Sequence, residues 1–261
     1  MSSLLEGKVA IVSGVGPGMG QATAKALARE GATVAMAART ESYLEQVAKE
    51  IEADGGRALP VPTDLVDASQ CQALVDRTVA EFGGLDVLVN AAFKPDVFRR
   101  FDEVDLNEWR SIFDVNVWGS LQLTQAAVPH LKERGGGSIV FVNTMEIRKP
   151  RQRLGGYASS KGALLVAARV LAYELGQHKI RVNSVVPGWM WGPPVQGYVD
   201  YMSQRKGMAP EDVIAGITAE IPLGEIPRQE DCAEAVVFFA SDLSRAITGQ
   251  ALDTNGGEVF D

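Results

Sequence analysis

The stretch that decides the fold runs from Lys8 to Gly20 and reads Lys-Val-Ala-Ile-Val-Ser-Gly-Val-Gly-Pro-Gly-Met-Gly. Its first six residues are apolar and rich in β-branched side chains, which is typical of a buried strand. Residues 21–30 follow the glycines as an alanine-rich helical pattern that ends before Gly31. Strand, glycine turn and helix form the context in which backbone N–H groups bind a pyrophosphate, although a tight turn alone would also explain the glycines.

The rest of the chain continues the alternation of strands and helices. Further strands are expected at residues 33–38, 57–62, 85–90, 138–143, 180–186 and 250–254, and further helices at 41–54, 68–82, 106–133, 156–178 and 229–241. This order predicts an α/β fold with a doubly wound parallel sheet and helices on both faces. No repeat or linker divides residues 1–261, so we expect a single domain. Residues 189–227 form one long excursion, of the kind that often acts as an active-site lid.

Composition indicates a folded chain without a disulfide framework. Of the 261 residues, 46% are hydrophobic, enough to bury one large core. The two cysteines, Cys71 and Cys232, imply no disulfide framework and favour a reducing cytoplasm. We find no signal peptide and no apolar run long enough for a membrane span. The 33 acidic and 25 basic side chains give a net charge of −8, which argues against a nucleic-acid partner.

Tyr157 and Lys161 carry the most informative chemistry in the second half of the chain. They stand four residues apart in an expected helix, so their side chains share one face. A phenol has an unperturbed pKa of about 10, and a nearby ammonium favours the phenolate. Tyr157 is therefore a candidate general acid or base, with Lys161 as the group that lowers its pKa. For this spacing alone, a surface pair on an ordinary helix is the alternative.

Several motifs stand in a fixed order along the chain. They are Ser13-Gly14, Gly18-Met19-Gly20, Asp64, Asn90-Ala91-Ala92, Asn116-Val117, Gly119, Thr144, Tyr157, Lys161, Asn183, Pro187-Gly188 and Thr248-Gly249-Gln250. Together they resemble the short-chain dehydrogenase/reductase family over nearly the whole chain. The resemblance implies a Rossmann-type domain, a nicotinamide cofactor and no metal. It places the family's Asn-Ser-Tyr-Lys tetrad on Asn116, Thr144, Tyr157 and Lys161.

The same resemblance implies a role for each of these side chains. Tyr157 would exchange a proton with the substrate oxygen, Lys161 would also bind the nicotinamide ribose, and Asn116 would position a water beside the lysine. The alternative for Asn116 is an exposed amide in the middle of a helix. Further cofactor contacts are implied for Gly14, Gly18, Met19, Gly20, Asp64, Asn90, Pro187 and Gly188. For Asp64, a helix N-cap or an Asx-turn is the alternative.

Three positions depart from the family pattern. Thr144 stands where serine is usual; its hydroxyl still donates a hydrogen bond, and its methyl group narrows the space beside the substrate. Ser138 is the competing assignment, at the start of a strand and far from the chemistry. Phe93 replaces a glycine beside the cofactor, where the ring would either wall the substrate pocket or repack the core. Gly192 replaces a threonine that often binds the carboxamide.

The end of the second expected strand bears on the cofactor's phosphate. NAD-binding versions of this fold place an acidic residue there to bind the ribose hydroxyls. Here Ala38 fills that position and Arg39 follows. A guanidinium binds a 2′-phosphate with paired, charge-assisted hydrogen bonds, so we expect NADP(H) in preference to NAD(H). The alternative is that Arg39 forms a surface ion pair with Glu41 or Glu45.

The substrate is the least defined part of the prediction. The 189–227 excursion is rich in aromatic and thioether groups, which suits a bulky apolar ketone or secondary alcohol. These are Trp189, Met190, Trp191, Val195, Tyr198, Tyr201, Met202 and Met208. Packing of the lid onto the body, or against another subunit, explains them equally well. Glu146, Arg148, Lys149, Arg151 and Arg153 follow Thr144, where the basic groups would either attract a phosphate-bearing acyl carrier or CoA thioester or form a solvated loop.

Three classes of function are consistent with these residues. The first is an NADP(H)-dependent oxidoreductase acting on an apolar or 3-oxoacyl-type ketone and its alcohol, or an NAD-dependent alcohol dehydrogenase. The second is an epimerase or dehydratase that uses the same Tyr157–Lys161 pair, and the third is a non-catalytic dinucleotide sensor. The helices expected at 106–133 and 156–178 are apolar on wide faces, which predicts a homotetramer.

Overall fold

The computed structural model describes residues 3–260 and contains a seven-stranded parallel sheet in the order β3-β2-β1-β4-β5-β6-β7. The strands are β1 (Val9–Ser13), β2 (Thr33–Ala38), β3 (Arg57–Pro62), β4 (Val87–Asn90), β5 (Gly137–Val142), β6 (Ile180–Pro187) and β7 (Ala251–Thr254). Each lies within two residues of its expected bounds. The order reverses direction between β1 and β4, as the doubly wound prediction requires.

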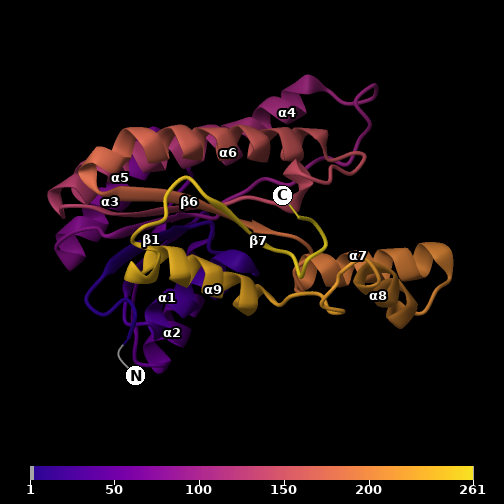
Figure 1. The fold of residues 1–261 in the computed structure, drawn as a ribbon, viewed down its shortest axis with the longest axis horizontal. Helices are drawn as coiled ribbons and strands as arrows, with labels where there is room; N and C mark the ends of the chain where they lie inside the picture. The colour runs from indigo at the N-terminus through magenta and orange to yellow at the C-terminus, as the bar shows by residue number, and fades with distance from the viewer. Residues whose placement is uncertain (1–2, 261) are drawn as a thin grey trace.

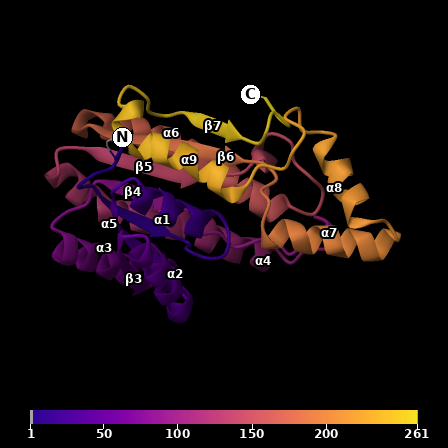
Figure 2. The same cartoon turned by 90° about the horizontal axis from the view of Figure 1, so that it is seen from below.

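Helices cover both faces of this sheet, as Figures 1 and 2 show. One face carries α1 (Met19–Arg29), α2 (Glu41–Ala53) and α9 (Gln229–Ala240), and the other carries α3 (Ala68–Phe82), α5 (Ser120–Glu133) and α6 (Gly155–Leu175). Each face has its own apolar core. Cys71 is buried in one core and Cys232 in the other, and both thiols are free. The prediction of a doubly wound α/β domain is confirmed.

The segment expected as one helix over 106–133 is interrupted in the structure. It consists of α4 (Leu106–Phe113), the π-helical turn η1 (Asp114–Gly119) and α5. A π turn inserts an extra residue into the helical repeat and is frequent at functional sites. Asn116 lies in this turn and is fully buried. The apolar periodicity predicted the helical run but not its interruption.

Residues 189–227 contain two helices, α7 (Pro193–Lys206) and α8 (Pro210–Thr218). Figure 2 shows them projecting beyond the carboxyl ends of the strands. They share a small apolar core of Val195, Val199, Val213, Ile217, Ile221 and Ile226. Val195 thus packs within the segment itself. Met190 packs against the apolar core on the sheet face covered by α1, α2 and α9, whereas Tyr201 is 56% exposed. Part of the apolar content of this segment is therefore structural.

Across residues 3–260, no helix combines the length and apolar character needed to cross a membrane.

Candidate active site

The glycine loop joins β1 to α1 by a turn that side chains would block. Gly14 has a φ of 78°, and a Cβ there would lie 2.3 Å from the Cα of Ala92. A Cβ on Gly20 would lie 2.1 Å from the carbonyl oxygen of Gly14. Gly18 is the N-cap of α1 and supplies no side chain to the first helical N–H groups. These groups are therefore directed at the loop, as binding of a pyrophosphate requires. Met19 is the first residue of α1 and is buried.

Arg39 directly follows β2, and β2 contacts the glycine loop. The Ala37 carbonyl accepts hydrogen bonds from the N–H groups of Gly14 (2.8 Å) and Val15 (3.1 Å). Arg39 is exposed and, within residues 3–260, has no ion pair with Glu41 or Glu45. Arg39 therefore follows the strand that contacts the loop, and it lacks the surface ion pair that was the alternative for it.

Asp64 follows β3 at the carboxyl end of the strands, the end at which β1 leads into the glycine loop. Its Oδ1 accepts the Val66 N–H over 3.1 Å, which makes an Asx-turn, while Asp67 is the N-cap of α3. The Asx-turn alternative is therefore present in the structure, and it leaves the second carboxylate oxygen for another contact. Asn90 ends β4, and its buried amide nitrogen donates to the Thr124 hydroxyl over 3.0 Å.

Asn116 joins two other segments through its amide. Its Oδ1 accepts from the Lys94 N–H over 2.6 Å, and its Nδ2 donates to the Lys94 carbonyl over 3.2 Å. The same nitrogen donates to the Ser160 hydroxyl over 2.9 Å, and Ser160 donates to the Tyr157 carbonyl over 2.7 Å. Asn116 is therefore buried and paired rather than exposed. Its contacts reach the first turns of α6, where Tyr157 and Lys161 lie.

Thr144 and Tyr157 meet beyond the end of β5. Thr144 is the N-cap of the 3-10 turn η2 (Met145–Ile147), and its side chain is hydrogen-bonded to that of Tyr157. Burial raises the pKa of the Tyr157 phenol to about 12; the bond from Thr144 and the Arg151 charge oppose this shift, and Glu146 adds to it. Ser138, the competing assignment, donates instead to the Phe239 carbonyl at the start of β5 (2.7 Å). Thr144 is thus the hydroxyl beside the phenol.

Lys161 lies in the interior of the protein at 1% exposure. Its ammonium donates to the Val142 carbonyl over 2.7 Å. Burial lowers the pKa of this amine to about 7. Burial is the largest influence on the pKa of Tyr157, and the Arg151 charge lowers it. The expectation that Lys161 lowers the pKa of Tyr157 stays a prediction.

The departures from the family pattern have clear places in the structure. Phe93 is 55% exposed, so it does not repack the core, and its ring stands edge-on to Tyr157 with centroids 6.0 Å apart. Pro187 ends β6, and Gly188 follows beside Met145 and Asn255, where an added Cβ would lie 2.7 Å from the Asn255 Cβ. Gly192 is the N-cap of α7 and provides no side-chain hydrogen bond.

Sequence reasoning missed Asp96 and Ser160. Asp96 lies in the loop after β4, is 5% exposed, and accepts the Tyr157 N–H over 2.8 Å. Asp96 follows Pro95 in a loop, and aspartate is common in turns, so this position did not stand out in the sequence. Ser160 stands between Tyr157 and Lys161 in the sequence, and this position is the one feature that could have marked it as a site residue.

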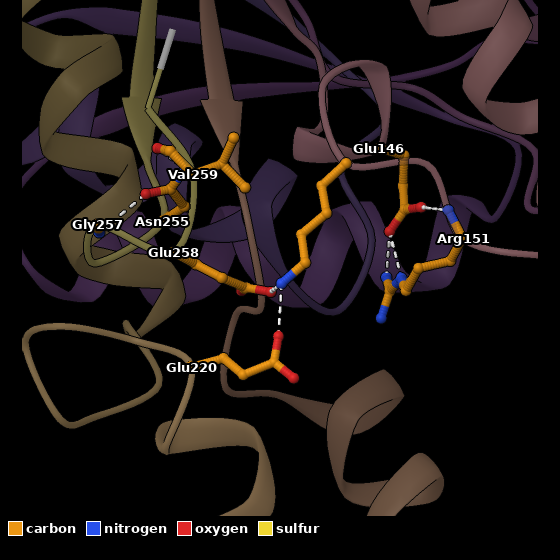
Figure 3. Close-up of polar contacts among 8 residues, drawn as sticks. Glu146, Arg151, Glu220, Asn255, Gly257, Glu258 and Val259 are labelled. Atoms are coloured by element: carbon orange, nitrogen blue, oxygen red, sulfur yellow. Dashed lines mark hydrogen bonds and ion pairs between the residues drawn. The ribbon is translucent and has the colours of Figure 1, made fainter.

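Three of the four basic residues after Thr144 are paired with carboxylates, two of them with carboxylates from other segments. Arg148 forms an ion pair with Asp253, and Lys149 contacts Glu220 (2.5 Å) and Glu258 (3.1 Å). Arg151 binds Glu146, which is drawn with Glu220 and Glu258 in Figure 3. A phosphate-bearing carrier would therefore compete with these carboxylates for the basic groups. The fourth basic residue, Arg153, is exposed.

Comparisons with known proteins agree with this arrangement. A family profile described as "Enoyl-(Acyl carrier protein) reductase" matches residues 14–258. The chain belongs to the short-chain dehydrogenase/reductase family. A short-chain dehydrogenase/reductase relative, the 3-oxoacyl-[acyl-carrier-protein] reductase of Thermotoga maritima, is 33% identical over 98% of this chain and 99% of its own. The cis-4-hydroxycyclohexanecarboxylate dehydrogenase of Sinomonas cyclohexanicum is 34% identical over 96% of both chains.

A solved structure of the same family has the same fold. A short-chain type dehydrogenase/reductase from Mycobacterium marinum superimposes with a TM-score of 0.86 at 31% identity, covering 100% of this chain and 98% of the other. Membership of the short-chain dehydrogenase/reductase family makes this protein an NAD(P)-dependent oxidoreductase. The glycine loop fits such a dinucleotide, since it leads into an uncapped helix N-terminus and its tight turn has no room for a Cβ on Gly14 or Gly20. Within residues 3–260, no three His, Cys, Asp or Glu side chains cluster as a metal site would require.

Proposed function

We propose that the protein interconverts an apolar ketone and its secondary alcohol with NADP(H), and that Tyr157 is the proton-transfer group. The observation that carries this proposal is the meeting of the Tyr157 phenol with the Thr144 hydroxyl, one helical turn before the buried Lys161. A phenol with a pKa of about 12 is protonated at neutral pH, so it is suited to donate a proton to a substrate oxygen. The bound dinucleotide would supply or accept the hydride.

Each side chain then has a defined task. The Tyr157 hydroxyl gives its proton to the carbonyl oxygen as negative charge develops there, and in the reverse direction the Tyr157 phenolate takes the proton of the alcohol. The Thr144 hydroxyl donates a hydrogen bond to the same oxygen. Lys161 holds the nicotinamide ribose, and Asn116 fixes the loop of Lys94 against the first turns of α6. Gly14, Gly18, Gly20, Asp64, Asn90, Pro187 and Gly188 hold the rest of the dinucleotide.

Preference for the phosphorylated cofactor rests on the end of β2. A carboxylate there would repel a 2′-phosphate, but the position is occupied by Ala38, and the exposed Arg39 follows it next to the glycine loop. A guanidinium can bind a phosphate with two parallel hydrogen bonds. These features support NADP(H) in preference to NAD(H).

The substrate class follows from what surrounds Tyr157. Phe93 stands on one side, and Trp189 begins the α7–α8 segment, which we propose acts as the substrate lid. The relative from Sinomonas cyclohexanicum is named for an alicyclic alcohol, and the one from Thermotoga maritima for a 3-oxoacyl group on a carrier protein. Because Arg148, Lys149 and Arg151 are already paired, this loop offers little free charge to an anionic carrier. We therefore favour a free apolar or alicyclic ketone over a carrier-bound substrate.

The test is a screen of alicyclic ketones, the matching alcohols and a 3-oxoacyl thioester, read as NADPH absorbance. Consumption of NADPH with a ketone supports the proposal. Tyr157→Phe should then lower kcat by about 10²-fold or more while NADPH fluorescence shows unchanged cofactor affinity. Turnover near wild type in that variant would remove Tyr157 from the mechanism. Product formation without net NADPH consumption would indicate an epimerase or dehydratase, and cofactor binding without turnover a sensor.

A further inference from the structure

An ion pair between the buried Glu146 and the partly exposed Arg151 lies near the proposed proton donor. Glu146 stands two residues after Thr144 in the 3-10 turn η2, and its side chain is only 2% exposed. Its carboxylate accepts the Arg151 backbone N–H over 3.0 Å and the Arg151 Nε–H over 2.5 Å. Arg151 Nη2 contacts the same carboxylate, as Figure 3 shows. The two guanidinium donors, Nε and Nη2, hold the Arg151 side chain against the Glu146 carboxylate, and the backbone N–H anchors the chain beside it.

The Arg151 guanidinium contacts Trp189, the first aromatic residue of the 189–227 segment that contains α7 and α8. The Arg151 Cζ lies 4.5 Å from the centroid of the Trp189 ring, within the range of a cation–π contact. Trp189 in turn packs on Tyr198 of α7, with centroids 5.1 Å apart. A continuous line of contacts therefore runs from the turn after Thr144, through Glu146 and Arg151, to helix α7.

The same pair lies within electrostatic reach of the Tyr157 phenol. The Glu146 charge raises the pKa of Tyr157, and the Arg151 charge lowers it. The two effects oppose each other, so each charge partly offsets the effect of the other on the pKa of the phenol. Removing one charge would leave the other uncompensated beside the phenol.

We propose that Arg151, held by Glu146, is a positioning residue that sets substrate specificity by fixing Trp189 as a wall of the substrate site. This inference rests on the proposed function for its kinetic consequences, but the contact line itself exists independently of any substrate. Arg151 orders the start of the lid segment, and the apolar face of Trp189 then favours an uncharged, apolar substrate portion at that wall. Loss of Arg151 would free Trp189 and loosen the fit to the substrate without altering the glycine loop.

The first test measures the lid segment by hydrogen–deuterium exchange, with no substrate present. Arg151→Met removes the guanidinium but leaves a buried carboxylate without its partner, which can destabilise the whole fold. The double variant Glu146→Gln/Arg151→Met avoids this, because it removes both charges. We expect faster exchange in peptides covering residues 189–206 in both variants, and unchanged exchange in peptides covering β1. The matched control is Arg57→Met, which deletes a guanidinium 5.3 Å from the Phe82 ring at the far edge of the sheet.

The second test measures kinetics on the ketone found in the screen. The double variant should raise the KM for the ketone about tenfold or more and leave the KM for NADPH within about twofold. Glu146→Gln alone should shift the pH profile of alcohol oxidation to lower pH, since it removes the charge that raises the pKa of Tyr157. Arg57→Met should do neither. A purely structural role for the pair would not move that profile.

The two tests separate the inference from the proposed function. Exchange in residues 189–206 that is unchanged in the double variant overturns the inference, whether or not any ketone is turned over. Faster exchange with an unchanged KM for the ketone also overturns it, because Trp189 then does not act on specificity. If the wild-type protein turns over no ketone, the proposed function fails, and the exchange experiment alone decides whether Arg151 holds the lid segment.

Discussion

The Tyr157 backbone N–H donates to the Asp96 carboxylate over 2.8 Å. Tyr157 lies in the first turn of α6, where N–H groups have no acceptor within the helix. The other oxygen of Asp96 accepts the Val97 N–H over 2.8 Å, so the carboxylate is fixed at both ends. Asp96 therefore ties the loop after β4 to the helix that presents Tyr157 and Lys161.

Replacing Asp96 by alanine should lower kcat, because the start of α6 and the Tyr157 phenol lose their anchor. We expect a decrease of about tenfold or more, together with a loss of about 1 kcal/mol in the free energy of unfolding. Asp96→Asn should retain most of the rate, since its Oδ1 still accepts the N–H. The control is Asp67→Ala, which removes the N-cap of α3 away from the site and should cost similar stability with unchanged kcat. Equal kcat in the two alanine variants would contradict a positioning role for Asp96.

Thr144→Val should slow turnover far more than Thr144→Ser. Valine has nearly the same shape but lacks the hydroxyl that is bonded to Tyr157, whereas serine keeps it. Loss of one donor to a developing oxyanion costs about 10²-fold in kcat. Steady-state kinetics of both variants on the same ketone provide the measurement. The opposite order of rates would take Thr144 out of the tetrad.

Lys161 should make the stability of the protein depend on pH. Its pKa is about 7 in the folded protein against an ordinary value of 10.5, so between these values the unfolded chain binds a proton that the folded one does not. The free energy of unfolding should therefore increase as pH rises from about 7 to about 10. Urea unfolding without added cofactor, at both ends of this window, measures the effect. In Lys161→Met the increase should be smaller by an amount on the order of a few kcal/mol at most. An identical pH dependence in that variant would show that Lys161 keeps its proton when buried.

Cofactor preference should depend on Ala38 and Arg39. Wild-type kcat/KM should favour NADPH over NADH, and Ala38→Asp/Arg39→Leu should reverse the preference because it replaces a cation by a carboxylate at the 2′ position. Kinetics with both cofactors on one ketone measure this. A wild-type preference for NADH of about tenfold, or an unchanged preference in the double variant, would exclude Arg39 as the phosphate ligand.

The exposed apolar face of α6 should mediate assembly into a homotetramer. Val166, Val170 and Tyr173 are 59%, 50% and 91% exposed on this helix. Such a row of apolar side chains on one helix face is typical of a subunit interface. Light scattering at micromolar concentration should give the tetramer mass, and Val166→Glu/Tyr173→Glu should reduce it. Ala80→Glu, on the exposed face of α3, is the control that should leave the mass unchanged. A wild-type monomer would refute the prediction.

The sequence predicted the fold closely because its signals are local. The bounds of β2, β3 and α3 follow from short apolar periods, turn residues and caps, which act over a few residues. The π turn at Asn116 was missed, since its cause is tertiary: the Asn116 amide binds Lys94 and Ser160, which periodicity cannot show. For the same reason, the basic run after Thr144 gave no sign of which carboxylates its members would meet.

By itself, then, the sequence determined the doubly wound sheet and placed the glycine loop, Thr144 and Tyr157 after the carboxyl ends of strands. Parallel strands bring those ends to one edge whatever the loops between them do. Only the tertiary structure decided that Asp96 holds Tyr157 and that Glu146 and Arg151 act on the phenol with opposite signs. It also decided that the Tyr157 phenol is held where burial raises its pKa. Exclusion of water and long-range pairing arise only when segments far apart in the sequence pack together, and no local pattern encodes them.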